Sequence, residues 1–143
     1  MTVAAILSGK GHDIITASAE TTLGEICETL AKRKIGAVVV CDGDNVIEGI
    51  VSERDIVRVV GTQGPDALKL SAHSVMTKDV ITCTAQNSVN EVMANMTKGR
   101  FRHMPVVEDG KLSGVISIGD VVKFKIAQVE LEAEQMRSYI SMT

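Results

Sequence analysis

The chain has 143 residues, of which 45% are hydrophobic, so it carries enough apolar material for one ordinary domain or two small ones. Its formal net charge is −3, and a weakly acidic chain is a poor electrostatic match for nucleic acid or an anionic membrane. No apolar run approaches the roughly 18 residues of a membrane helix, and the first residues lack the basic flank and long apolar stretch of a secretory signal. We therefore predict a cytoplasmic protein that binds neither nucleic acid nor membrane.

Residue types that carry metal or redox chemistry are few and scattered. The cysteines have no C-x-x-C spacing and the histidines lie far apart: Cys27, Cys41, Cys83, His12, His73 and His103. A zinc site needs several such ligands at close spacing, so we expect isolated buried thiols and no metal requirement. The sequence contains no G-x-G-x-x-G loop, P-loop, G-x-S-x-G elbow or H-E-x-x-H helix. These observations predict that the protein is not an enzyme.

The first predicted strand and helix recur 66 residues later. Residues 13–17 (DIITA) match residues 79–83 (DVITC), and S/T-x-x-E sequences at residues 22–25 and 88–91 keep the same offset. Such a sequence is a capping box, whose hydroxyl and carboxylate bind free backbone N–H groups where a helix begins. Behind each box, apolar residues have the i, i+3, i+4, i+7 spacing of one buried helix face: Leu23, Ile26, Cys27 and Leu30, then Val89, Val92, Met93 and Met96.

A β-hairpin is predicted after each of these helices. Apolar residues 37–41 and 104–108 each lead into Asp-Gly, a dipeptide that favours a tight turn with positive φ. Return strands follow at residues 47–51 and 112–116. The offset between the two copies changes from 67 to 65 residues across the turn, so the first turn is predicted to be two residues longer.

Each return strand ends in the same seven-residue phrase, after which a second helix is predicted. The phrase is GIVSERD at residues 49–55 and GVISIGD at residues 114–120, and its glycine would allow close approach of backbone. Each unit therefore reads strand, helix, strand, strand, helix. A single unit of about sixty residues is marginally stable alone, so we expect the two units to pack together as an α+β fold.

Turn-rich residues 61–66 separate the units. We therefore predict a first repeat at residues 10–66, a second at residues 67–128 and a helical extension at residues 129–143.

The double phrase, at the end of a hairpin that follows a capped helix, resembles the CBS domain, a family named for cystathionine β-synthase. Residues 75–82 (VMTKDVIT) and 102–107 (RHMPVV) are also similar to sequences of that family, and the resemblance covers roughly residues 10–128. It implies a tandem pair of repeats with pseudo-two-fold symmetry, facing sheets and two clefts for adenosine-containing ligands. It also implies a sensing role, often for a partner domain, and this chain carries no such domain itself.

The serine and aspartate of each phrase, Ser52 with Asp55 and Ser117 with Asp120, lie where a strand passes into a helix. A helix N-terminus presents unpaired N–H groups that suit a phosphate, and a carboxylate in the first turn suits two ribose hydroxyls. The S-x-x-D sequence also caps helices, and for a single copy capping is the favoured interpretation. Its occurrence at equivalent positions of a repeat favours ligand binding, and both roles can coexist.

The resemblance places an adenine against strand edges, with backbone groups selecting the base. Because aromatic residues make up only 2% of the chain, the base is expected to lie mainly against aliphatic side chains. The residues expected to border the base are Thr16, Ala17, Gly36, Ala37, Val38, Thr82, Cys83, Met104 and Pro105. Core packing is the alternative role for the apolar members of this set.

Basic residues distinguish the second repeat from the first. Arg102 and His103, with Arg100 just before them, align with the uncharged residues 35–37 of the first repeat. In the family such residues often contact phosphate, which suits the two-pronged guanidinium; a solvated basic turn is the alternative. Arg54 is expected to be an exposed helix residue first and a phosphate contact second.

Together these features predict a stand-alone regulatory module that binds AMP, ADP, ATP or NAD(H) and senses energy or redox state for an unidentified partner protein. A structural dimerisation unit without a ligand is the alternative, and a nucleotide-processing enzyme ranks third.

A long helix is predicted after Asp120, because the chain contains no proline or glycine beyond it. Its apolar residues follow with spacings of 4, 3, 4, 3 and 4, the pattern of a coiled-coil seam: Val122, Ile126, Val129, Ala133, Met136 and Ile140. Exposing such a stripe costs roughly 25 cal/mol per Å². We therefore predict a homodimer with this helix at the interface; folding back onto the chain's own repeats is the alternative.

Overall fold

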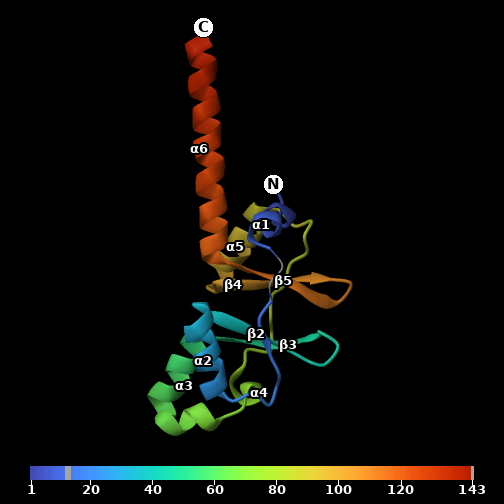
Figure 1. Cartoon of the computed structure of the whole chain (residues 1–143), viewed down its shortest axis with the longest axis vertical. Coiled ribbons are helices and arrows are strands. Elements are labelled where there is room, and N and C mark those ends of the chain that lie inside the picture. Colours follow the sequence, from blue (N-terminus) through green and yellow to red (C-terminus); the bar gives the residue numbers. More distant parts are fainter. Residues whose placement is uncertain (12–13, 143) are drawn as a thin grey trace.

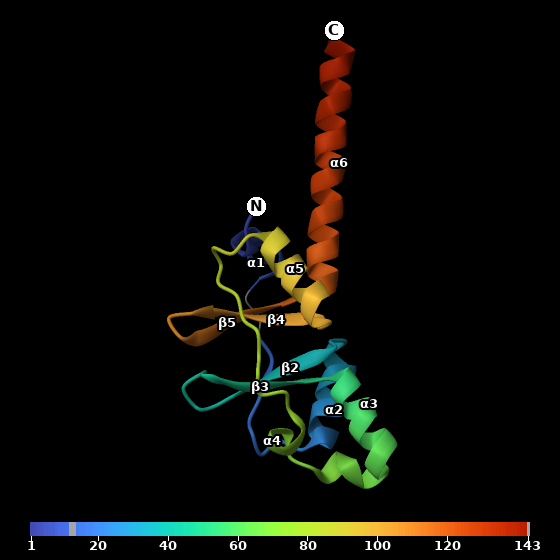
Figure 2. The same cartoon turned by 180° about the vertical axis from the view of Figure 1, so that it is seen from behind.

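The computed structural model describes residues 1–11 and 14–142. Two repeats are stacked so that their hairpins lie together in the middle, helices cover both outer sides, and one long helix projects from the body (Figure 1). The view from behind shows the same arrangement (Figure 2). The predicted α+β pair of repeats is therefore confirmed.

Both repeats contain the predicted order of elements. The first has β1 (Thr16–Ala17), α2 (Leu23–Arg33), β2 (Ala37–Cys41), β3 (Ile47–Ser52) and α3 (Glu53–Gln63). The second has α5 (Val89–Gly99), β4 (His103–Glu108), β5 (Lys111–Ser117) and α6 (Ile118–Met142). Helix α1 (Val3–Lys10) precedes the first repeat, and a 3-10 helix η1 (Pro65–Lys69) and α4 (Ala72–Val75) connect the two.

The two sheets differ in how fully their first strand is formed. In the first sheet, β1 is parallel to β2, and β2 is antiparallel to β3. In the second, β4 and β5 are antiparallel, and Cys83 forms a single parallel bridge with Val106 at the place equivalent to β1.

The two predicted capping boxes begin α2 and α5. The Thr22 hydroxyl accepts a hydrogen bond from the Glu25 backbone N–H at 3.2 Å, and the Ser88 hydroxyl accepts one from Glu91 at 3.0 Å. The hydroxyl half of each box is thus confirmed, and it fixes where each helix starts.

The hairpin turns differ from the prediction in length. Cys41 pairs with Ile47 across five residues, and the equivalent pair of Val107 with Leu112 spans four, within which Glu108 also pairs with Lys111. Counted between equivalent pairs, the first hairpin is therefore longer by one residue, not by two. The predicted alignment slipped because both turns contain Asp-Gly, but the strands around them pair in a different register.

The Asp-Gly dipeptides also behave differently from each other. Asp109 and Gly110 both have positive φ, as the tight-turn prediction requires. In the first turn Asn45 takes the left-handed conformation instead, and the Asp42 carboxylate accepts hydrogen bonds from the backbone N–H groups of Asp44 and Val46. A side chain thus organises the longer turn.

Each repeat is completed by the segment that precedes the other one. Val3, Ile6 and Leu7 of α1 are buried in the core of the second repeat. In the same way, Ala72 and Met76 of the connection are buried in the core of the first repeat. The two packed cores are therefore not divided at the same residues as the two sequence repeats.

Helix α6 continues without a break from the second repeat through residues 129–142, in keeping with the long helix predicted after Asp120. Among the described residues, no helix is both long enough and apolar enough to cross a membrane.

Candidate functional site

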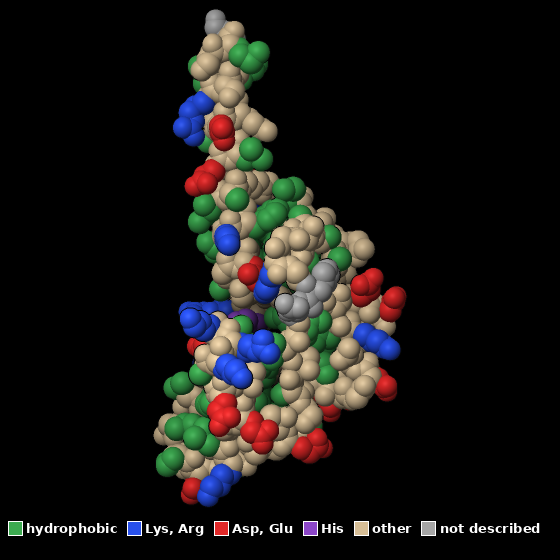
Figure 3. All heavy atoms as spheres, viewed as in Figure 1, with side chains coloured by type: hydrophobic (Ala, Val, Ile, Leu, Met, Phe, Trp, Pro, Cys, Tyr) green, Lys and Arg blue, Asp and Glu red, His purple; other side chains and the backbone are tan. Residues whose placement is uncertain are grey.

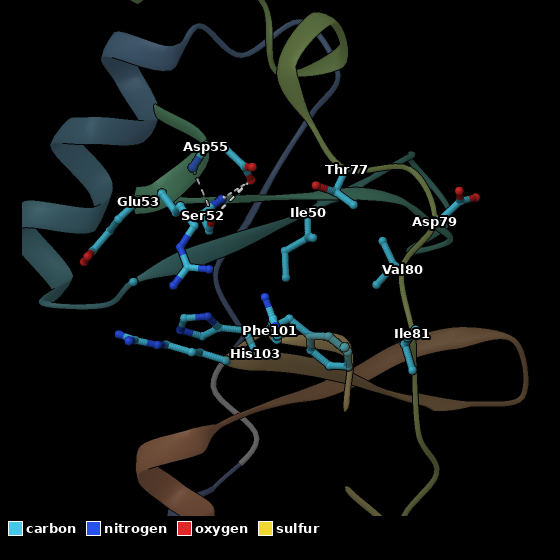
Figure 4. Close-up of a pocket in the computed structure, with 15 residues that line it drawn as sticks. Ile50, Ser52, Glu53, Asp55, Thr77, Asp79, Val80, Ile81, Phe101 and His103 are labelled. Atoms are coloured by element: carbon cyan, nitrogen blue, oxygen red, sulfur yellow. Dashed lines mark hydrogen bonds between the residues drawn. The ribbon is translucent and has the colours of Figure 1, made fainter. Parts of the chain in front are cut away.

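A cavity of about 430 Å³ lies between the repeats, where the start of α3 faces the chain just before β4. The close-up shows Ser52, Glu53 and Asp55 on one side, Phe101 and His103 on the opposite side, and Val80 and Ile81 at one flank (Figure 4). The cavity is lined by Gly36, Ile50, Ser52, Glu53, Arg54, Asp55, Thr77, Asp79, Val80, Ile81, Gly99, Arg100, Phe101, Arg102 and His103.

Ser52 and Asp55 form a complete capping box at the start of α3. The Asp55 carboxylate accepts hydrogen bonds from the Ser52 backbone N–H at 2.9 Å and from its hydroxyl at 3.0 Å. Arg58 donates to the other carboxylate oxygen at 3.1 Å. Asp55 is the one buried charged residue among those described, so the capping role is confirmed and the carboxylate is held in one orientation at the cavity wall.

The apolar walls of the cavity come from both repeats. Ile50 of β3 exchanges two backbone hydrogen bonds with Thr77, at 2.9 and 3.0 Å, which carries residues 79–81 past the edge of the first sheet. On the other side Phe101 packs partly against the core of the second repeat. Its ring lies directly over Gly99, where a Cβ atom would overlap it. One aromatic ring is therefore available beside the aliphatic side chains of Ile50, Val80 and Ile81, which remain the larger part of the apolar lining.

Cationic side chains surround the cavity. Arg54, Arg100 and Arg102 line it and are all exposed, and Lys and Arg side chains gather where the two halves of the molecule meet (Figure 3). A positive rim beside a helix N-terminus suits a phosphate.

His103 lies deeper in the cavity than the arginines. Burial lowers the pKa of its imidazole below the ordinary value, while the Glu53 carboxylate acts in the opposite direction. Gly36 leaves room for this ring, because a Cβ atom there would lie 3.1 Å from Cε1 of His103.

The strand register corrects the predicted alignment in this region by one residue. Ala37 pairs with Ser52, and His103 pairs with Ser117. His103 therefore corresponds to Ala37, and Arg102 corresponds to Gly36. The contrast between basic and uncharged residues remains at Arg102 and His103, whereas Arg100 corresponds to another basic residue, Lys34.

Seven of the predicted site residues lie together in the cavity: Gly36, Ser52, Arg54, Asp55, Arg100, Arg102 and His103. The others do not line it. Ala37, Val38, Cys83, Met104 and Pro105 are buried in the sheets, and Thr82 is exposed. Thr16 and Ala17 lie in a shallow hollow of the first repeat with residues 18–21, 41–43 and 48.

Ser117 and Asp120 repeat the capping geometry at the start of α6. The cation that contacts Asp120 is a lysine, whereas the one that contacts Asp55 is Arg58. The Asp120 backbone N–H donates to the Ser117 hydroxyl at 3.1 Å, and the Ser117 N–H donates to the Asp120 carboxylate at 2.9 Å. Lys10 of α1 donates to the same carboxylate at 2.5 Å and to the Val115 backbone oxygen at 2.8 Å. The two equivalent aspartates are therefore in different environments.

Several lining residues were not among the predicted ones, notably Asp79, Val80, Ile81, Gly99 and Phe101. Residues 79–81 belong to the repeated segment DVITC (residues 79–83), of which the prediction used only Thr82 and Cys83. The implied pseudo-two-fold symmetry with facing sheets could have identified these residues. In such a pair the aspartate of one repeat lies beside strand edges of the other.

The cysteines fit the expectation of isolated thiols. Cys41 and Cys83 are buried, Cys27 is half-buried, and all three are free. Burial raises the pKa of the Cys83 thiol to about 11, which leaves little reactive thiolate at neutral pH. Within residues 1–11 and 14–142, no group of three His, Cys, Asp or Glu side chains is placed to hold a metal ion.

The CBS domain model matches residues 10–62 and 72–127, which is most of the chain. The chain belongs to the CBS domain family. Its structure is similar to a CBS-domain containing protein from Agrobacterium tumefaciens, with 46% identity and a TM-score of 0.84, covering 87% of this chain and 99% of that one. It is also similar to the CBS domain pair of protein MJ0100, with 25% identity and a TM-score of 0.79, covering 90% and 98%. That CBS pair was solved in complex with 5-methylthioadenosine and S-adenosyl-L-methionine.

Curated relatives of this CBS protein include larger proteins of Arabidopsis thaliana. CBSCBSPB1 is 31% identical over 85% of this chain, which spans only 22% of that relative's length. The mitochondrial protein CBSX3 is 29% identical over 97% of this chain, which spans 71% of its length.

Proposed function

We propose that this CBS pair is a non-catalytic regulatory module that binds an adenosine-containing nucleotide in the cavity at Asp55 and signals its occupancy to a partner protein. AMP, ADP, ATP and NAD(H) are the proposed ligands, since all share the adenosine part. The proposed location is cytoplasmic, and neither nucleic acid nor membrane is a proposed partner.

The observation that carries the proposal is the composition of the cavity. A buried, oriented carboxylate at Asp55 lies at a helix N-terminus, apolar side chains from both repeats face each other, and arginines stand at the rim. In the proposed complex, Asp55 accepts hydrogen bonds from the ribose hydroxyls, Phe101 and Ile81 contact the base, and the arginines contact the phosphates. The adenosyl ligands of MJ0100 support the same ligand class.

The outcome of binding follows from the position of the cavity. Because both repeats line it, a ligand would join them and stabilise one mutual arrangement. A partner protein that contacts both repeats would then distinguish the ligand-bound from the ligand-free pair.

Calorimetric titration of Asp55→Asn with adenosine, AMP, ADP, ATP, NAD and S-adenosylmethionine tests this proposal. Asparagine keeps an oxygen for capping but removes the charge, so nucleotide affinity should fall about ten- to a hundredfold, the equivalent of roughly 1.5–3 kcal/mol. Asp66→Asn, on the exposed η1 turn, is the matched control and should bind as the wild type does.

Unchanged affinity of Asp55→Asn for every ligand would exclude the ribose role. If the wild-type chain binds none of the six, the structural dimerisation unit becomes the better account.

A further inference from the structure

Helix α6 projects from the body with most of its length uncovered (Figures 1 and 2). Only its first turns are packed: Val121 is fully buried, and Phe124 packs against the core of the second repeat. Every residue from 129 to 142 is exposed. The alternative prediction, in which the helix folds back onto its own repeats, is therefore wrong.

Hydrophobic side chains nevertheless continue along the projecting helix (Figure 3). Val129, Met136 and Ile140 are each 58–62% exposed, and Ile126 is 53% exposed. With Ala133 they form one stripe along a 25-residue helix. A stripe with alternating spacings of 3 and 4 is the seam of a two-helix coiled coil, so a second helix of the same pattern is the occupant that fits it.

The residues in the seam fit a parallel two-stranded arrangement. When Ile126 is placed at heptad position a, Ala133 and Ile140 also fall at a, and Val129 and Met136 fall at d. Within parallel coiled coils, a β-branched residue such as isoleucine at position a is typical of two strands.

The charges beside the seam select the same arrangement. Positions g and e carry Lys125 and Glu130 in one heptad step, then Glu132 and Arg137 in the next. In a parallel, in-register pair, Lys125 faces Glu130 of the partner subunit, and Glu132 faces Arg137 of the partner subunit, so both contacts join opposite charges. Lys125 also donates to Asn90 at 3.2 Å in the same chain, so the Glu132–Arg137 pair is the cleaner of the two.

An antiparallel pair that overlaps the whole seam joins like charges. When the stripe from Val122 to Ile140 is matched along its full length, so that Ala133 faces Val129 of the partner subunit, Glu130 lies beside Glu130 of the partner subunit. The same match sets Glu132 beside Glu132 of the partner subunit. Like charges at these positions disfavour a pairing.

From this pattern we propose that α6 joins two copies of the chain as a parallel, in-register coiled coil. The pairing places both nucleotide cavities at the same end of the dimer. It does not depend on whether nucleotide binds, so it goes beyond the proposed function.

Disulfide trapping of the full-length chain tests the register. In a parallel dimer Ala133 faces its own copy, so Ala133→Cys should form a disulfide-linked dimer under mild oxidation. Ser138→Cys, on the outer face of the same helix, should not. In the antiparallel pairing, residue 133 faces residue 129, so neither Ala133→Cys nor Val129→Cys would crosslink alone but a mixture of the two would. That result would overturn the proposal.

Charge exchange tests the contact in solution. Glu132→Lys and Arg137→Glu should each raise the dimer dissociation constant about tenfold, and the double variant E132K/R137E should restore it, because the pair is re-formed with exchanged signs. Light scattering over a dilution series measures this, and calorimetry should show unchanged nucleotide affinity in all three variants. A wild-type chain that stays monomeric at high micromolar concentration, or a double variant no better than the single ones, would refute the interface.

Discussion

Asp55 and Asp120 occupy equivalent positions in the two repeats, yet each meets a different cation. Asp55 pairs with Arg58 of its own helix, whereas Asp120 pairs with Lys10, 110 residues away in sequence. Burial acts to raise the pKa of the Asp120 carboxyl, but hydrogen bonds from Lys10 and the Ser117 N–H outweigh it and lower the pKa. A ribose at Asp120 would therefore have to displace an ammonium group.

Lys10→Ala should open this second position. Without the ammonium, the affinity of the Asp120 site for AMP should rise about tenfold, an amount limited by the 38% exposure of the Lys10 side chain. Calorimetric titration should then change from one ligand bound per chain towards two. Lys69→Ala, which removes an exposed pair with Asp66, is the control, and identical stoichiometry in Lys10→Ala would contradict the displacement argument.

His103 should make stability depend on pH. Its folded-state pKa lies below the unfolded value of about 6.5, so the unfolded chain binds more protons. Stability should therefore fall as the pH is lowered through 6.5 towards the folded pKa. The charged neighbours of the ring are Glu53, Lys10, Asp120 and Arg102.

Urea unfolding of wild type and His103→Gln at pH 7.5 and 5.5 measures this contribution. The wild type should lose more free energy of unfolding than the variant, by less than about 1.4 kcal/mol per pH unit, the limit for one group. If wild type and variant lose equal free energies of unfolding between the two pH values, His103 has the same pKa in the folded and the unfolded chain.

At the scale of elements, two equivalent glycines let the connecting segments approach the return strands. A Cβ atom at Gly49 would lie 2.6 Å from the sulfur of Met76 and 2.9 Å from the Thr77 backbone oxygen. A Cβ atom at Gly114 would lie 3.0 Å from Leu7. The sequence analysis inferred a close approach of backbone at these glycines. The groups that approach them belong to other segments of the same chain.

Gly49→Ala should destabilise the protein by about 1–3 kcal/mol, the cost of overpacking, because one of its contacts is backbone and cannot rotate away. Chemical unfolding measures the loss. Gly43→Ala is the matched control: nothing lies within 4 Å of its Cβ position, and its stability should change little. Equal stability of both variants would show that residues 76–77 can shift without cost.

At the scale of the whole molecule, the two repeats are linked because the segment that precedes each repeat packs into the core of the other. The α1 helix of the N-terminus completes the core of the second repeat, and residues 70–76 complete that of the first. Facing sheets bury Val39, Cys41 and Leu112 in a third cluster between them. The core of the second repeat therefore combines residues 3–7 with residues 83–124, whereas the core of the first repeat lies within residues 15–76.

Leu7→Ala should therefore weaken a repeat that begins far along the sequence. The leucine is 3% exposed, so the loss should be about 2–5 kcal/mol. Hydrogen exchange should show the larger loss of protection in α5 and β5 rather than in the nearer α2. Leu131→Ala, at a residue of α6 that is 56% exposed, is the matched control. Loss confined to α2 would contradict the exchanged packing.

The sequence determined the elements of this protein and their order, because the signals are local. Capping by Thr22 and Ser88, turn formation at Asp109-Gly110 and the apolar helix faces each depend on residues within a few positions of one another. Repetition of these signals 66 residues apart was enough to predict the pair of repeats.

Only the tertiary structure decided which residues meet. The cavity combines Asp55 of one repeat with Phe101 of the other, and Lys10 reaches Asp120, because facing sheets bring each aspartate beside strand edges of the opposite repeat. The sequence-based prediction placed the base beside Thr82 and Cys83, whereas residues 79–81 of the same segment line the cavity. Cys83 pairs with Val106 of β4 in a single bridge, which buries it in the core of the second repeat.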